Sequence, residues 1–109
     1  MASPPMYKCL VNGAIGADAR RAIVDGLTEL TGVHFGEHEL TVEFIEIPEG
    51  RWFTAGRPSR ASMVLGTVPT GTAQGVRVTF MDAIARLFAD ATDTDYHDVM
   101  VSAPDRKVS

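Results

Sequence analysis

Two segments of the chain have the apolar spacing of an amphipathic helix, and each lies between segments with the spacing of a β-strand. The helical stripes are Ile23, Leu27 and Leu30 in the first segment and Phe80, Ile84, Leu87 and Phe88 in the second. This order constrains the fold strongly, because helices that connect strands of one sheet must cover that sheet. The sequence therefore predicts an α/β fold in which β-α-β is repeated twice.

The expected strands are short and are bounded by glycine, proline or polar residues. They are residues 6–11, 38–47, 61–68 and 97–103, with a further short strand at 52–54. The first helix should begin near Ala17 and end near Gly32, because glycine commonly terminates helices. Thr72 is the expected N-cap of the second helix. The polar tail from Pro104 onward is expected to be mobile.

The two halves also match each other when the sequence is shifted by 57 residues. The shift places Ile23 on Phe80, Leu27 on Ile84, Leu30 on Leu87, Val42 on Val99 and Phe44 on Val101. This match of apolar class indicates an internal repeat. Two right-handed β-α-β units would place both helices on one face of a four-stranded mixed sheet.

The other face of that sheet is also predicted to be apolar. The residues that indicate this are Met63, Val64, Leu65 and Val68 in one strand and Val99 and Met100 in another. A sheet that has helices on one side, yet is apolar on both, usually buries its second face against another subunit. The sequence therefore predicts an oligomer.

Composition limits the setting and the partners. The 109 residues fit a single domain, residues 1–109 with a core from 5 to 104, and 45% of them are hydrophobic, which is enough for a core. A net charge of −4 disfavours nucleic acid and anionic membranes as partners. Cys9 is the one cysteine, and no apolar run has the length of a signal peptide or a membrane span. A cytoplasmic protein is expected.

Four stretches together resemble the tautomerase superfamily. They are "PMYKCLV", "LTG" near the end of the first helix, "VEFIEIPEGRWFTAGRPS", and "VLGTVPTGTAQG" before the second helix. The sequence is most similar to the branch of cis-3-chloroacrylic acid dehalogenase and related actinobacterial tautomerases, with macrophage migration inhibitory factor as a more distant relative. The resemblance implies a trimer whose three sheets enclose a central barrel.

In that superfamily an N-terminal proline performs the chemistry, and the Pro-x-Tyr start aligns that proline with Pro5, ahead of Tyr7. Desolvation lowers the pKa of a free secondary amine toward neutrality, where a general base works best. Four residues precede Pro5, however, so its nitrogen is a tertiary amide without a proton. Loss of Met1 would expose Ala2. Pro5 is therefore a catalytic candidate only if processing exposes it.

Other positions that the dehalogenase-like members use also differ here. Leu27 stands where they carry a histidine, Pro69 and Thr72 where two arginines hold a substrate carboxylate, and Ser102 nearest to a tyrosine on the last strand. The C-terminal segment that supplies a glutamate in those proteins has no counterpart before Ser109. Dehalogenation and water addition are therefore not expected.

The remaining candidates would contact a substrate. Ser102 is the second catalytic candidate, because its hydroxyl can hydrogen-bond a substrate oxygen. Arg57 and Arg60 could replace the missing arginines, since guanidinium groups bind carboxylates bidentately. Thr72 opens a helix whose N–H groups can hold an anion, and Tyr7 lies beside Pro5. A purely structural role is the alternative for each.

No metal site or cofactor is expected. His34, His38 and His97 do not have the spacing of metal ligands. Cys9 lies within the first strand and is expected to be a buried thiol.

Three functions are compatible with these features. The first is an isomerase-like enzyme, with a rebuilt site, that acts on a small enolisable or unsaturated carbonyl compound, for instance in biosynthesis. The second is a non-catalytic partner subunit or small-ligand-binding pseudoenzyme, in a homotrimer or in a mixed oligomer with a paralogue. The third is a ferredoxin-like module that binds a small ligand or RNA; the acidic charge argues against RNA.

Overall fold

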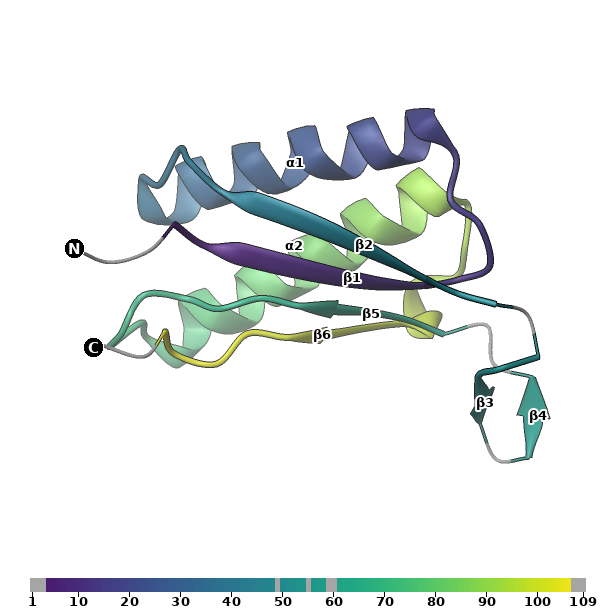
Figure 1. The fold of residues 1–109 in the computed structure, drawn as a ribbon. Helices are drawn as coiled ribbons and strands as arrows, with labels where there is room; N and C mark the ends of the chain where they lie inside the picture. Colours follow the sequence, from purple (N-terminus) through teal and green to yellow (C-terminus); the bar gives the residue numbers. More distant parts are fainter. Residues whose placement is uncertain (1–3, 49, 55, 59–60, 107–109) are drawn as a thin grey trace.

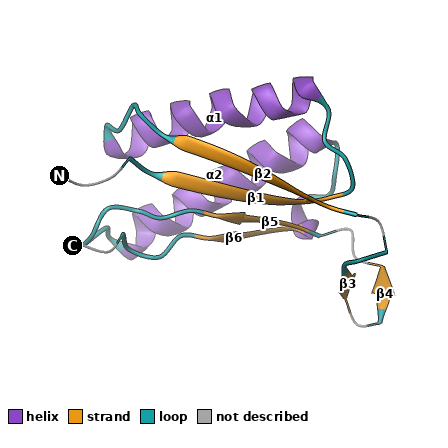
Figure 2. Ribbon diagram, viewed as in Figure 1, coloured by secondary structure: helices purple, strands orange, loops and turns teal. Residues whose placement is uncertain are grey.

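The computed structural model describes residues 4–48, 50–54, 56–58 and 61–106 (Figure 1). In chain order the elements are β1 (Met6–Asn12), α1 (Ala17–Phe35), β2 (Thr41–Ile47), β3 (Phe53–Thr54), β4 (Arg57–Pro58), β5 (Ser62–Leu65), α2 (Gln74–Thr92), a 3-10 helix η1 (Tyr96–Asp98) and β6 (Val99–Ser102). Both helices cover the same face of the sheet (Figure 2). The predicted α/β fold with two β-α-β units is confirmed.

The main sheet has four strands in the order β2-β1-β5-β6. The outer strands run parallel to their neighbours, whereas the central strands β1 and β5 are antiparallel, so the sheet is mixed as predicted. β3 and β4 form a separate two-stranded hairpin, which projects from the end of the sheet opposite the N-terminus (Figure 1).

The core lies between the sheet and the two helices. β1 supplies Tyr7, Cys9 and Val11, which alternate with more exposed residues as a strand with one covered face requires. The helices supply the buried residues Ile23, Leu27, Phe80, Ile84 and Phe88, which include most of the predicted stripes.

The two helices have the same bounds in the two repeats, because Ala17 and Phe35 become Gln74 and Thr92 after a shift of 57 residues. The residues that follow the helices, Gly36 and Asp93, both adopt the left-handed conformation. The outer strands deviate from this shift: Tyr7 pairs with Val42, whereas Val64 pairs with Val101. The predicted match of Val42 with Val99 is therefore two residues out of register.

The sheet face opposite the helices carries several apolar side chains. They are Met6 and Leu10 on β1, Ile45 on β2, Met63 and Leu65 on β5, and Met100 on β6. Met6 and Met100 are 44% and 45% exposed, and together with their neighbours on this face they form an exposed apolar patch. The prediction that both faces are apolar is confirmed, and these residues are called the open face below.

Several predicted boundaries are wrong. β2 begins at Thr41 rather than at residue 38, and β5 ends at Leu65 rather than at residue 68. α1 continues past Gly32 and ends at Phe35, where Gly36 takes a φ of 67°. Ala73, not Thr72, precedes α2, and no side chain caps this helix. Residues 104–106 of the tail are held in place, because Val68 and Asp105 form a β-bridge and the Arg106 N–H donates to the Val68 carbonyl at 2.7 Å. Within the described residues, no helix is long and apolar enough to cross a membrane.

Candidate functional site

The end of the sheet at which β1 begins brings together residues that lie far apart in the sequence. The loop between β5 and α2 lies there, and so does the chain after β6 (Figure 1). Pro5, Thr72 and Ser102 therefore belong to the same end of the molecule, as the resemblance implies. Whether they act on a substrate remains a proposal.

Pro5 is buried at the head of β1. Its carbonyl accepts a hydrogen bond from the Thr41 N–H at 2.9 Å, which continues the ladder between β1 and β2. Its nitrogen is joined to Pro4 in a tertiary amide and cannot take up a proton near neutral pH. In the intact chain Pro5 therefore stands at the start of a strand and cannot act as a general base.

Tyr7 lies inside the core rather than beside an open site. Its side chain is 1% exposed, and its hydroxyl lies 2.8 Å from the Thr31 hydroxyl. The Thr31 hydroxyl in turn donates to the Leu27 carbonyl at 2.7 Å. Burial raises the pKa of Tyr7, so the phenol stays protonated. The structure therefore places the predicted substrate contact at Tyr7 out of reach of a ligand.

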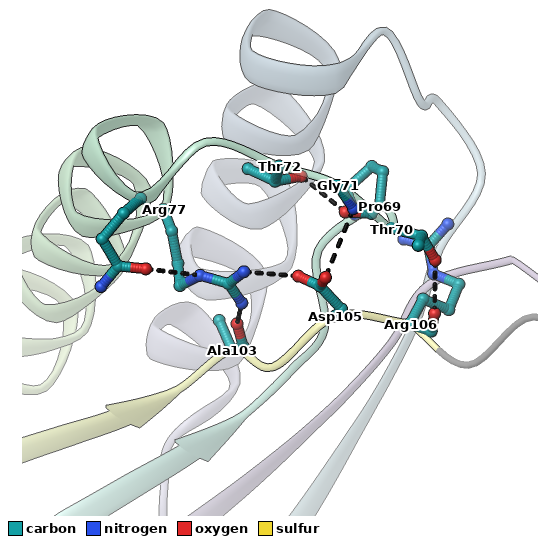
Figure 3. A network of polar contacts seen from close by, with 9 residues as sticks. Pro69, Thr70, Gly71, Thr72, Arg77, Ala103, Asp105 and Arg106 are labelled. Carbon is teal, nitrogen blue, oxygen red and sulfur yellow. Dashed lines mark hydrogen bonds and ion pairs between the residues drawn. The ribbon is translucent and has the colours of Figure 1, made fainter.

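The chain after β6 is bound to α2 through Arg77 (Figure 3). The Arg77 guanidinium donates to the Ala103 carbonyl at 2.6 Å and to the Asp105 carboxylate. The Gly71 N–H donates to the other Asp105 oxygen at 3.3 Å. The Arg77 hydrogen bond, helped by that of Gly71, lowers the pKa of Asp105. Asp105 is thus an ionised carboxylate held in the loop before α2.

At the same end of the sheet, Arg106 forms an ion pair that links the two edges of the sheet. Its two terminal nitrogens donate to the two Glu37 carboxylate oxygens at 2.8 and 2.9 Å, and the side chains are only 18% and 26% exposed. Arg106 comes from the chain beyond the edge strand β6, whereas Glu37 precedes the other edge strand, β2. The hydrogen bond from Arg106 lowers the pKa of Glu37.

Ser102 ends β6 opposite Leu65, and its side chain is exposed on the open face. Its carbonyl accepts a hydrogen bond from the Gly66 N–H at 2.8 Å. Because the side chain is exposed, its hydroxyl can bond a ligand. Thr72 is half-buried, and its hydroxyl donates to the Pro69 carbonyl at 2.6 Å, so this hydroxyl closes the loop before α2.

The two predicted arginines do not join this group within one chain. Arg57 lies in β4, and the β3–β4 hairpin projects from the opposite end of the sheet (Figure 1). Arg60 lies outside the described residues.

The structure places two other arginines, Arg77 and Arg106, at the end where β1 begins. Sequence reasoning missed both, because Arg77 lies on a helix and Arg106 in a tail that was expected to be mobile. The one available signal was the "PDR" that directly follows the last strand, since a charge there faces the loop before the second helix.

The other titratable candidates have structural environments. Cys9 is fully buried, and burial raises its pKa to about 12, so the thiol is unreactive near neutral pH. His34 lies against the Leu30 carbonyl and the Phe80 ring. Among the described residues, no group of three His, Cys, Asp or Glu side chains could hold a metal ion.

The sequence matches no family model, and no curated protein matches it significantly. Solved structures do match it over nearly its whole length. The native protein Ps01740 superposes with a TM-score of 0.86 at 24% identity, over 94% of this chain and 95% of that chain. N1, a member of the cis-3-chloroacrylic acid dehalogenase (cis-CaaD) family, gives 0.84 at 20% identity, over 93% and 74%.

The Q0 fused 4-OT, a wild-type symmetric trimer, gives a TM-score of 0.83 at 14% identity, over 93% of this chain and 85% of that chain. The chain has the tautomerase fold. The resemblance in the sequence is therefore confirmed for the fold, although the identities are too low to carry over a substrate or a reaction.

Proposed function

We propose that this protein is a tautomerase-superfamily enzyme that acts on a small enolisable or unsaturated carbonyl compound at the end of the sheet where β1 begins. The observation that carries the proposal is the tautomerase fold over nearly the whole chain, with Pro5 buried at the head of the first strand. The exposed hydroxyl of Ser102 belongs to the same end and can donate a hydrogen bond to a developing enolate, whereas the Arg106 guanidinium is bonded to Glu37 and Thr67.

Enolisation moves a proton from the carbon beside a carbonyl to a base, and the enolate then takes a proton at oxygen or at another carbon. Hydrogen-bond donors lower the barrier when they lie where the negative charge develops. Ser102 is our candidate donor in the intact chain. Among the described residues of this end, neither carboxylate is a strong base, because Arg106 lowers the pKa of Glu37 and Arg77 lowers the pKa of Asp105. A chain trimmed to Pro5 would supply a secondary amine as that base.

A trimer is part of this proposal. The open face presents apolar side chains from all four strands of the main sheet, and burying them against other subunits would remove that area from water. The similarity to fused 4-OT trimers supports the same assembly. β4, which carries Arg57, lies at the far end of its own chain's sheet, so Arg57 would meet this site only across a subunit boundary.

A non-catalytic role is the second candidate, and one observation favours it. The Pro5 nitrogen is acylated, and the neighbouring carboxylates and guanidiniums are paired with one another as Glu37–Arg106 and Asp105–Arg77. Such a chain could serve as a partner subunit or as a small-ligand-binding pseudoenzyme.

Enol-to-keto conversion of phenylpyruvate separates the two candidates, because the enol absorbs ultraviolet light and the keto form does not. An enzyme should accelerate the conversion, and Ser102→Ala should slow it by roughly tenfold or more through loss of one enolate donor. Thr70→Ala is the matched control, since it removes a hydroxyl of the same end that donates to the Arg106 carbonyl. Rates equal to the uncatalysed reaction would favour the non-catalytic role.

A further inference from the structure

The structure contains a second site that corresponds to the Pro5 position through the internal repeat. The shift of 57 residues that relates α1 to α2 places Pro5 on Ser62. A cavity of about 260 Å³ lies at Ser62, at the opposite end of the sheet from Pro5. Its lining includes Val11, Asn12, Ile15, Gly16, Ser62 and Thr94.

The cavity and the Pro5 end are built from equivalent residues. Under the same shift, Ile15 falls on Thr72 and Thr94 falls on Glu37, both at the Pro5 end. The two ends differ in the charge and the bonding partner of these equivalent residues. At the Pro5 end Arg106 bonds Glu37, whereas Thr94 at the other end has a neutral hydroxyl that contacts the Thr92 hydroxyl at 2.8 Å.

Ser62 provides a polar group directed into this cavity. The residue is only 5% exposed, and among the described residues its hydroxyl has no hydrogen-bond partner. No fully enclosed polar side-chain atom of the described residues lacks a partner. The Ser62 hydroxyl must therefore open into the cavity that the residue lines, and a buried hydroxyl of this kind gains by bonding a ligand.

The two helices present opposite partial charges to the cavity. α1 begins there at Gly16 without a capping side chain, so its first N–H groups can bind a carboxylate, and Asp18 is the acidic residue of that first turn. α2 ends there at Thr92, followed by Asp93, and both its last carbonyls and the Asp93 carboxylate favour a positive group. Between these two poles the wall is apolar, with Val11, Ile15 and Ala91.

We propose that the Ser62 cavity binds a small aliphatic amino acid as its zwitterion. The carboxylate would accept hydrogen bonds from the first turn of α1 and from the Ser62 hydroxyl. The ammonium group would face Asp93 and the end of α2, and the short side chain would lie on the apolar wall. A simple anion would be repelled by Asp93, and a simple cation by the start of α1. The site does not depend on the chemistry proposed at the Pro5 end.

The test is a titration of the full chain with L-valine, followed by 1H–15N NMR. Saturable shift changes should be confined to the amides of the first turn of α1, Ser62 and Thr94. 3-Methylbutanoate lacks the ammonium group and so loses the contact with Asp93, and isobutylamine lacks the carboxylate and so loses the hydrogen bonds from α1 and Ser62. Each should therefore bind at least roughly tenfold more weakly. Equal binding of the three compounds, or changes that do not saturate, would overturn the proposal.

Two variants locate the site. Ser62→Ala and Asp93→Asn should each weaken L-valine binding by roughly tenfold, and the spectra of the free variants report whether they are folded. Ser102→Ala lies at the other end of the sheet and should bind L-valine as the unmodified chain does. Shift changes centred on Glu37 and Thr72, or unchanged affinity in Asp93→Asn, would show that the amino acid does not bind in this cavity.

Discussion

Lys8 faces Leu65 across the central ladder of the sheet, and a shift of 57 residues turns the one position into the other. A residue that pairs with its own repeat equivalent marks a local two-fold axis between β1 and β5. This axis relates the Pro5 end of the molecule to the Ser62 end. The two halves have diverged on either side of it, most visibly where a tyrosine ring in one half requires a glycine in the other.

That glycine is Gly66, and its replacement should destabilise the protein. A Cβ atom at Gly66 would lie 2.6 Å from Cε1 and 2.7 Å from Cδ1 of the buried Tyr7 ring. Gly66→Ala should therefore lower the free energy of unfolding by about 1–3 kcal/mol in urea denaturation, as overpacked cores do. Gly75→Ala is the control, because no atom lies within 4 Å of its Cβ. Equal stability of the two variants would contradict the contact.

The open face should determine the oligomeric state. Met63→Glu introduces a charge between Leu10 and Met100, its two cross-strand neighbours on the open face, which a buried interface cannot accommodate without a partner. The unmodified chain should sediment as a trimer, and Met63→Glu as a smaller species. Val33→Glu is the matched control, since Val33 is 75% exposed on α1, and it should remain trimeric. A monomeric unmodified chain at micromolar concentration would refute the assembly.

Most of the fold could be predicted because its signals are local. Apolar spacing located both helices, and the alternation of Met63, Val64 and Leu65 correctly predicted two apolar faces. The end of α1 was wrong because Gly32 and Gly36 lie within one turn of each other, and only the second takes the left-handed conformation. Thr72 has the side chain of an N-cap, but its hydroxyl bonds the Pro69 carbonyl instead.

The polar contacts of the candidate site could not be predicted in the same way. Arg106 binds Glu37, which lies 69 positions earlier, and Asp105 binds Arg77, which lies 28 positions earlier. No periodic pattern links residues so far apart, so the tail appeared to be an ordinary solvated end. The position of Arg57 depended on the path of a hairpin whose glycine-rich and proline-rich sequence has no helical or strand periodicity.

The ion pair between Glu37 and Arg106 should stabilise the protein in a pH-dependent way. Because Arg106 lowers the pKa of Glu37, the stabilisation should be complete above the ordinary glutamate pKa and should decrease as the pH falls below it. Glu37→Gln should cost about 1–2 kcal/mol at pH 7 and should remove this dependence. A double-mutant cycle with Arg106→Gln measures the coupling, and zero coupling would mean that the pair contributes nothing.

Burial of Cys9 should make the protein less stable at high pH. The thiol has a pKa of about 12 in the folded protein, against 9.0 for an unperturbed thiol. Between these values the unfolded chain loses the proton and the folded chain keeps it, so stability should fall by at most about 1.4 kcal/mol per pH unit. Cys9→Ala should lack this contribution in denaturation experiments from pH 9 upward. Parallel pH profiles for the two proteins would exclude it.

Pro5 should act as no base in the intact chain, because an amide nitrogen shares its lone pair with the carbonyl and takes no proton near pH 7. We expect intact mass to show a chain that begins at Met1 or Ala2. Pro5→Ala in that chain should keep the rate of any phenylpyruvate conversion within a few-fold of the unmodified chain. The free energy of unfolding should fall at most modestly, because the N-terminal segment becomes more flexible.

In a preparation with residues 1–4 removed, the amine of Pro5 is free, and its burial at the head of β1 would lower its pKa toward neutrality. That preparation should then be faster by about 10²–10⁴-fold, the usual contribution of a general base. A trimmed chain no faster than the intact one would exclude a proline mechanism, whereas a native chain that begins at Pro5 would restore it.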